Sequence, residues 1–120
     1  MKRKILVVDD DLLLLGSLGL LLSEEGYIVD LIDKSALVRD SIDVFKPDLI
    51  IMDILLDDGD GREICDSIKN SNLTTEIPII LLTALSHQKI SEFDCQADAI
   101  IGKPYNAHIL LQTAADLLKQ

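Results

Sequence analysis

Four groups of residues that follow apolar runs of the chain have side chains suited to chemistry at phosphorus. The acids 9–11 follow the run ILVV (5–8), and Asp53 ends the run DLIIMD (48–53). Thr83 and Ala84 close the run that starts at residue 77, and Lys103 follows DAIIG (98–102). Carboxylates together with phosphate oxygens hold Mg²⁺, and an aspartate can act as a nucleophile toward phosphorus. Phosphoryl transfer otherwise needs positioning and charge neutralisation, so these residues suit that chemistry if the fold brings them together.

The apolar runs themselves predict the strands that must position these residues. Each run has the length of a strand and is apolar without alternation, which is typical of strands buried on both faces of a parallel sheet. A weaker strand over residues 27–33 suits a sheet edge. Segments of helical length and period lie over 12–25, 35–45, 61–71 and 106–120, and residues 84–98 predict a short fourth helix. Strand and helix alternate five times, which predicts a doubly wound α/β sandwich with helices on both faces.

Helix boundaries are marked by residues that favour caps. Asp11 is the predicted N-cap of the first helix and Asn106 that of the last, and Ser35 can cap the second. Gly26 suits the position after a helix C-terminus, and Pro47 ends the second helix. In a doubly wound fold the functional site lies at the carboxyl ends of the strands, where all four polar groups fall.

Length and charge restrict the class of protein. The chain has 120 residues and a formal net charge of −10, so we expect one domain over 1–120, without an output domain. A strongly acidic chain argues against direct binding to nucleic acid or to an anionic membrane, because both need a basic face. The uncharged run over residues 12–23 is shorter than the ~20 residues that span a bilayer. With no signal-peptide pattern either, we expect a cytoplasmic protein.

The two cysteines do not suggest a cofactor or a cross-link. Cys65 and Cys95 lie far apart, and neither has a CxxC or CxH companion. This pattern favours free thiols in a reducing compartment over a disulfide or a zinc site.

The ordered set of polar groups makes the chain resemble a response-regulator receiver domain of the chemotaxis-regulator type. Such domains are the phosphoacceptors of two-component signalling. The shared features are the acids after the first strand, Asp53 after the third, Thr83 after the fourth and the pair Lys103-Pro104 after the fifth. The resemblance covers essentially the whole chain, and it implies a five-stranded parallel sheet in the order 2-1-3-4-5.

The resemblance also implies a phosphoacceptor and a metal site. Asp53 would accept a phosphoryl group from a sensor histidine kinase or a histidine phosphotransfer protein. Asp9 and Asp10 would bind Mg²⁺ together with Asp53, and the backbone carbonyl of Leu55 would be a further ligand. Elementary electrostatics agrees, because an anionic donor that approaches three carboxylates is repelled unless a dication and an ammonium offset their charge.

Further residues would contact the phosphoryl group or transmit its presence. Thr83, Ala84 and Lys103 would contact phosphoryl oxygens, and Pro104 would follow a cis peptide bond. Ile100 occupies a position that usually carries an aromatic switch residue, so the link between phosphorylation and an unknown downstream target is open. Receivers of this kind also suggest a dimer through the fourth helix, the fifth strand and the fifth helix.

Three other interpretations of these residues compete with a phosphoacceptor receiver. The first is a degenerate receiver that serves as a protein-interaction module, which Ile100 and the replacement of a usual proline by Asp57 would favour. The second is a phosphatase of the haloacid-dehalogenase type, which needs an acid where Leu55 stands. The third is a calcium loop in DDGDG (57–61), which lacks its first and last ligands because Leu56 and Ser67 stand there. A solvated turn is the preferred interpretation of DDGDG.

The first helix is unusually rich in leucine. The spacing of Leu14, Leu18, Leu21 and Leu22 predicts the stripe that faces the core, so four further leucines are expected to be partly exposed: Leu12, Leu13, Leu15 and Leu20. Exposed aliphatic side chains next to the site would suit docking of a helical phosphodonor, for which we single out Leu12, Leu13 and Leu15. The alternative is a leucine-rich helix that simply exposes some of its side chains.

Overall fold

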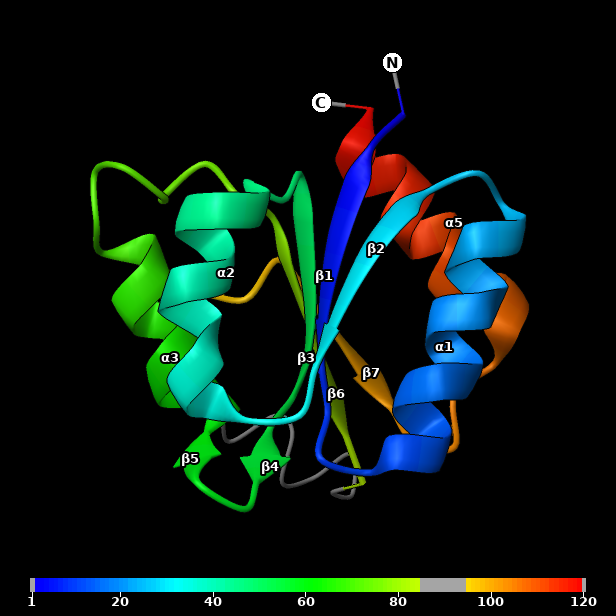
Figure 1. Ribbon diagram of the computed structural model, residues 1–120, viewed down its shortest axis with the longest axis horizontal. Coiled ribbons are helices and arrows are strands. Elements are labelled where there is room, and N and C mark those ends of the chain that lie inside the picture. Colours follow the sequence, from blue (N-terminus) through cyan, green and yellow to red (C-terminus); the bar gives the residue numbers. More distant parts are fainter. Residues whose placement is uncertain (1, 85–94, 120) are drawn as a thin grey trace.

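Five parallel strands form the central sheet of the computed structural model, which describes residues 2–84 and 95–119 (Figure 1). They are β1 (Lys4–Val8), β2 (Ile28–Ile32), β3 (Leu49–Asp53), β6 (Ile79–Thr83) and β7 (Ala99–Gly102). Their spatial order is β2-β1-β3-β6-β7. Because β6 and β7 are the fourth and fifth strands of the sheet along the chain, the predicted order 2-1-3-4-5 is confirmed.

Helices cover both faces of this sheet. Figure 1 shows α1 (Leu12–Glu24) and α5 (Ala107–Leu118) on one face, and α2 (Val38–Phe45) and α3 (Gly61–Lys69) on the other. The predicted fourth helix falls mainly on residues 85–94, which lie outside the described residues. Among the helices of the described ranges, none is both long and apolar enough to cross a membrane.

A short hairpin follows the third strand of the sheet. It consists of β4 (Leu55–Leu56) and β5 (Gly59–Asp60), which pair antiparallel. In Figure 1 the hairpin lies at the end of the molecule where the sheet strands have their carboxyl ends. The run DDGDG is therefore part of an ordered element and not only a solvated turn.

The strand residues divide between two apolar clusters on opposite faces of the sheet. In β1, Ile5 and Val7 pack with the side chains of α1 and α5, whereas Leu6 and Val8 pack with those of α2 and α3. Successive side chains of a strand point to opposite faces. A strand buried on both faces must therefore be apolar at every position, which is why these runs do not alternate. The edge strands β2 and β7 are only partly buried.

The buried face of α1 is not the one that we predicted. Leu15, Leu18 and Leu22 are the buried leucines of this helix, and Leu15 is only 6% exposed. Leu14 and Leu21, which were assigned to the core, are only partly buried. The prediction that Leu15 is partly exposed and available for docking is therefore wrong.

The cause of this error is that leucines alone do not fix the rotation of a helix. Gly19 also lies on the buried face, where a Cβ would lie 2.7 Å from the side chain of Leu31 in β2. The remaining leucines are exposed as expected, with exposed fractions of 66% for Leu12, 88% for Leu13 and 63% for Leu20.

The predicted caps are confirmed in two cases and wrong in one. The carboxylate of Asp11 accepts a hydrogen bond from the N–H of Leu14, and the side chain of Asn106 accepts one from Ile109. Ser35 caps no helix, because a 3₁₀ turn over Ser35–Leu37 precedes α2 and has no side-chain cap. Its hydroxyl donates instead to the backbone carbonyl of Asp58, in the turn between β4 and β5.

Both cysteines are free thiols. Cys65 is fully buried, and this burial raises the pKa of its thiol to about 12. A thiol in such surroundings is a small apolar side chain, since the reactive species is the thiolate.

The two faces of α1 give a direct test of its orientation. We expect Leu15→Ala to lower the free energy of unfolding by about 2–5 kcal/mol, because it opens a cavity beneath the helix. Leu13→Ala, on the exposed side, should change it by less than about 0.5 kcal/mol. Urea unfolding followed by circular dichroism measures both, and equal effects would contradict this orientation of α1.

Candidate functional site

The end of β1 brings a buried carboxylate to the carboxyl end of the sheet. Asp9 is 1% exposed, and both of its carboxylate oxygens have partners. One accepts a hydrogen bond from the backbone N–H of Asp11 at 2.9 Å, and the other lies 3.0 Å from Nζ of Lys103. A buried carboxylate is stable only with such partners.

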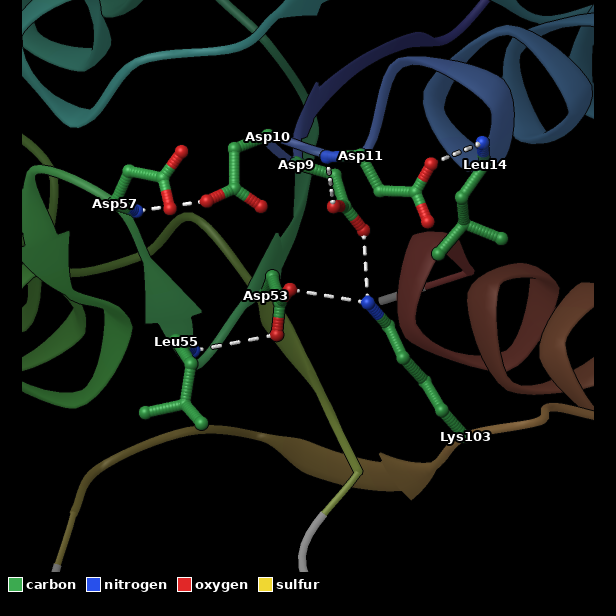
Figure 2. Close-up of polar contacts among 8 residues, drawn as sticks. All are labelled: Asp9, Asp10, Asp11, Leu14, Asp53, Leu55, Asp57 and Lys103. Atoms are coloured by element: carbon green, nitrogen blue, oxygen red, sulfur yellow. Dashed lines mark hydrogen bonds and ion pairs between the residues drawn. The ribbon is translucent and has the colours of Figure 1, made fainter.

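The carboxyl end of β3 delivers a second carboxylate in the same way. Asp53 is the last residue of this strand and is 8% exposed. One oxygen accepts a hydrogen bond from the N–H of Leu55 at 3.2 Å, and the other lies 3.0 Å from Nζ of Lys103. Figure 2 shows the ammonium group between the carboxylates of Asp9 and Asp53.

The end of β7 positions this ammonium group. The backbone N–H of Lys103 donates to the carbonyl of Thr83 at 2.6 Å, which joins the ends of β6 and β7. The peptide bond between Lys103 and Pro104 is cis, as expected. The lysine side chain is only 18% exposed, and it reaches along the sheet edge to both carboxylates.

Burial and charge together set the protonation of these groups. Burial raises the pKa of Asp53, and the charge of Asp9 adds to this effect, while the hydrogen bond and the charge of Lys103 oppose it. Burial alone would lower the pKa of Lys103, but its hydrogen bonds to Asp53 and Asp9 outweigh burial and raise it. One ammonium thus neutralises two carboxylates only in part.

A third carboxylate completes a donor set that suits a divalent cation. Asp9, Asp10 and Asp53 each bring a carboxylate oxygen to within 4.8 Å of the others. Hard cations such as Mg²⁺ bind carboxylate oxygens and water. With three carboxylates and one lysine, the cluster carries an excess of negative charge that such a cation would offset. The residues present therefore fit the Mg²⁺ that the family resemblance implies.

Asp10 is linked to the hairpin. Its carboxylate accepts a hydrogen bond from the backbone N–H of Asp57 at 2.7 Å (Figure 2). The carboxyl group of Asp57 also lies near that of Asp10. The close approach of the two carboxyl groups, with the repulsion between their charges, raises the pKa of Asp57.

The other hairpin acids have structural partners that sequence reasoning missed. The carboxylate of Asp58 accepts hydrogen bonds from the N–H groups of Ser35 and Ala36 at 2.9 and 3.3 Å. Asp60 is the N-cap of α3 and pairs with Arg62 at 2.7 Å. A capping-box pattern, with an acid and then a glutamate three residues later, could have revealed Asp60. No local signal announces Asp58, whose partners lie more than twenty residues away.

Gly61 fixes the backbone of the central carboxylate. Its N–H donates to the carbonyl of Ile54 at 2.7 Å. An added Cβ at Gly61 would clash with the carbonyl oxygen of Asp53 and lie 2.9 Å from Cα of Ile54. Only glycine fits this contact, so Gly61 belongs to the structure of the site although sequence reasoning gave it no role there.

The remaining predicted residues lie at the end of β6, within β7 and at the start of α1. Thr83 ends β6 and is 1% exposed, and Ala84 follows it as an exposed residue. Ile100 pairs with Leu81 in the sheet, two residues before the strand end, and packs against the α2 and α3 side. Exposed Leu12 lies at the start of α1, directly after the acidic cluster.

Fold and site together define a class: a doubly wound α/β protein with a carboxylate and lysine cluster at the carboxyl edge of its sheet. The family model for the response regulator receiver domain matches residues 5–115. The chain therefore belongs to the response regulator receiver domain family.

Curated relatives support this assignment. The chain is 32% identical over 123 residues to the DNA-binding dual master transcriptional regulator RpaA of Synechocystis, covering 98% of this chain and 49% of that protein. It is 32% identical over 122 residues to the response regulator MprA of Mycobacterium tuberculosis, covering 100% of this chain and 52% of that protein. The chain thus spans about half the length of these curated relatives.

A solved structure is similar over nearly the whole chain. It is the signal receiver domain of a signal transduction histidine kinase from Syntrophus aciditrophicus, with a TM-score of 0.90 and 31% identity. The match covers 98% of this chain and 90% of that one.

The close contact at Gly61 predicts an unusual cost for a small substitution. We expect Gly61→Ala to destabilise the protein by about 1–3 kcal/mol, because the new methyl group must displace the backbone at Asp53. Gly16→Ala is the matched control, since that glycine lies in α1 with no atom within 4 Å of its Cβ position. The control should stabilise the protein by about 0.5–1 kcal/mol. Thermal unfolding in EDTA distinguishes them, and a neutral Gly61→Ala would refute the packing contact.

Proposed function

We propose that this receiver is a phosphoacceptor whose covalent site is Asp53. The observation that carries the proposal is the shared ammonium of Lys103, which lies 3.0 Å from Asp53 and 3.0 Å from Asp9. Two carboxylates of different strands are thus held around one cation, next to a third carboxylate. Such a site is arranged for an incoming group that carries its own negative charge and for a metal that offsets it.

In the proposed reaction a carboxylate oxygen of Asp53 attacks the phosphorus of a phosphohistidine. The new bond joins this oxygen to phosphorus, and the bond between phosphorus and the imidazole nitrogen breaks. The nitrogen keeps the electron pair of that bond and takes up a proton when it leaves. Lys103 would pair with one phosphoryl oxygen, and Thr83 and the backbone at Ala84 would bind others.

Asp9, Asp10 and Asp53, with the backbone carbonyl of Leu55, would hold Mg²⁺, which supplies charge neutralisation at the phosphoryl oxygens. The excess of carboxylate over ammonium in the cluster supports this role. Because of the same excess, the carboxylates of the cluster repel one another in the metal-free protein. Binding of the cation should therefore also raise the stability of the folded state.

The proposed partners are a sensor histidine kinase or a histidine phosphotransfer protein, and a downstream target. Leu12 and Leu13 are the part of the predicted docking surface that the fold leaves exposed. Dimerisation through the fourth helix, β7 and α5 stays a proposal, and its helix lies outside the described residues. The alternative of a degenerate receiver draws on Ile100 and Asp57, but the intact cluster around Asp53 favours phosphorylation.

Labelling with a small phosphodonor tests the proposed acceptor. We expect acetyl phosphate with Mg²⁺ to add one phosphoryl group, seen as a mass increase in intact-protein mass spectrometry. EDTA should abolish the addition, because the carboxylate cluster then repels the anionic donor.

Asp53→Asn should remove labelling completely, whereas Asp43→Asn, on α2, is the control for loss of one surface charge. Labelling that survives in Asp53→Asn would refute the site. Failure of the wild-type protein both to be labelled and to bind beryllofluoride would favour the degenerate receiver.

The exposed leucines of α1 predict a separate effect on the natural donor. We expect Leu13→Asp to slow phosphotransfer from the cognate kinase by at least about tenfold, because a charge replaces apolar contact area in the interface. Labelling by acetyl phosphate should be unchanged, since that donor needs no docking. Val44→Asp is the matched control, because Val44 is 84% exposed but lies on α2, across the sheet. Equal rates for the two variants would contradict docking at α1.

A further inference from the structure

The three carboxylates of the cluster are not held in the same way. Asp9 and Asp53 share the ammonium of Lys103. Asp10 lies at the outer side of the cluster, and its hydrogen-bond donor in residues 2–84 and 95–119 is the backbone N–H of Asp57, at 2.7 Å. Figure 2 shows this contact on the opposite side of the cluster from Lys103.

The hairpin holds this donor in a fixed place. Leu55 pairs with Asp60, and Leu56 pairs with Gly59, so the turn between the strands is closed. The next residue, Asp58, binds the start of the 3₁₀ turn through its carboxylate and accepts a hydrogen bond from the hydroxyl of Ser35 at 3.0 Å on its carbonyl. The N–H of Asp57 therefore lies on a short segment with anchors on both sides.

The backbone at Asp57 would accept a residue without this donor. In the described ranges Lys46 is the non-glycine residue with positive φ, so φ at Asp57 is negative. Leu56 is extended in β4, which suits a residue before proline, and Asp57 is the second residue of the turn, where proline is favoured. Receivers usually carry proline there, and proline has no N–H.

We propose that Asp57 is a positioning residue for the cation site and acts through its backbone N–H on the carboxylate of Asp10. This inference rests on the proposed function and deepens its account of the metal. A carboxylate that already accepts a hydrogen bond has a set orientation, and partners of this kind strengthen metal binding by its ligands. In this chain the hairpin gives Asp10 the support that Lys103 gives Asp9 and Asp53.

Two variants isolate the donor. Asp57→Ala and Asp57→Pro both remove the carboxylate, but only Asp57→Pro removes the N–H. We expect the dissociation constant for Mg²⁺, measured by calorimetry, to be about tenfold higher in Asp57→Pro than in Asp57→Ala. The rates of labelling by acetyl phosphate at saturating Mg²⁺ should agree within about twofold, because the fault is in metal binding and not in the phosphoryl step. Equal dissociation constants would overturn the proposal.

A second measurement does not depend on whether Asp57→Pro folds. In the amide spectrum of the wild-type protein, the proton of Asp57 should lie downfield, and Asp10→Ala should shift it upfield because the charged acceptor is lost. An unchanged amide resonance would overturn the proposal. A wild-type protein that binds Mg²⁺ but is not labelled would refute the proposed phosphoacceptor function, while the comparison of the alanine and proline variants still decides the role of Asp57.

Discussion

One electrostatic constraint governs this structure: three carboxylates are gathered at the carboxyl end of the sheet, and a single ammonium group pairs with two of them. Carboxylates this close repel one another, and burial makes the repulsion stronger because water no longer screens it. Burial raises the pKa of Asp53, and Lys103 offsets only part of this effect. Burial would lower the pKa of Lys103, but its hydrogen bonds to Asp53 and Asp9 raise it. The folded chain therefore keeps an unbalanced negative charge at one place, and the proposed Mg²⁺ would offset this imbalance.

The parallel sheet makes this arrangement possible. In a parallel sheet all carboxyl ends lie along one edge, so a residue that closes a strand meets residues that close its neighbours. The interior strands β1, β3 and β6 are buried on both faces by apolar side chains, which anchors the ends that carry Asp9, Asp53 and Thr83. Lys103 comes from the edge strand β7, and its backbone bond to Thr83 joins it to the rigid part of the sheet.

The residues that the sequence predicted well are those whose signal is local or repeated. The strand-terminal acids follow unbroken apolar runs, and Asp11 and Asn106 stand where N-caps are common, so these strand ends and these two caps were predicted correctly. The orientation of α1 was misjudged because its leucines occupy every face, and its buried face is set by packing against other elements, including Leu31 of β2 next to Gly19. Ser35 was misassigned for the same reason, since its partner Asp58 lies 23 residues further along the chain.

The hairpin β4–β5 shows why the rest of the site could not be predicted from residue types. Its acids add negative charge next to a cluster that already has an excess, and backbone N–H groups stabilise two of these carboxylates. Asp58 accepts from the N–H groups of Ser35 and Ala36, and Asp60 accepts from that of Arg62. Asp57 reverses the relationship, because its own N–H is donated to Asp10. A contact made by the main chain can be formed by any residue except proline. The contact is therefore available because residue 57 is not a proline, and no pattern of side chains would reveal it.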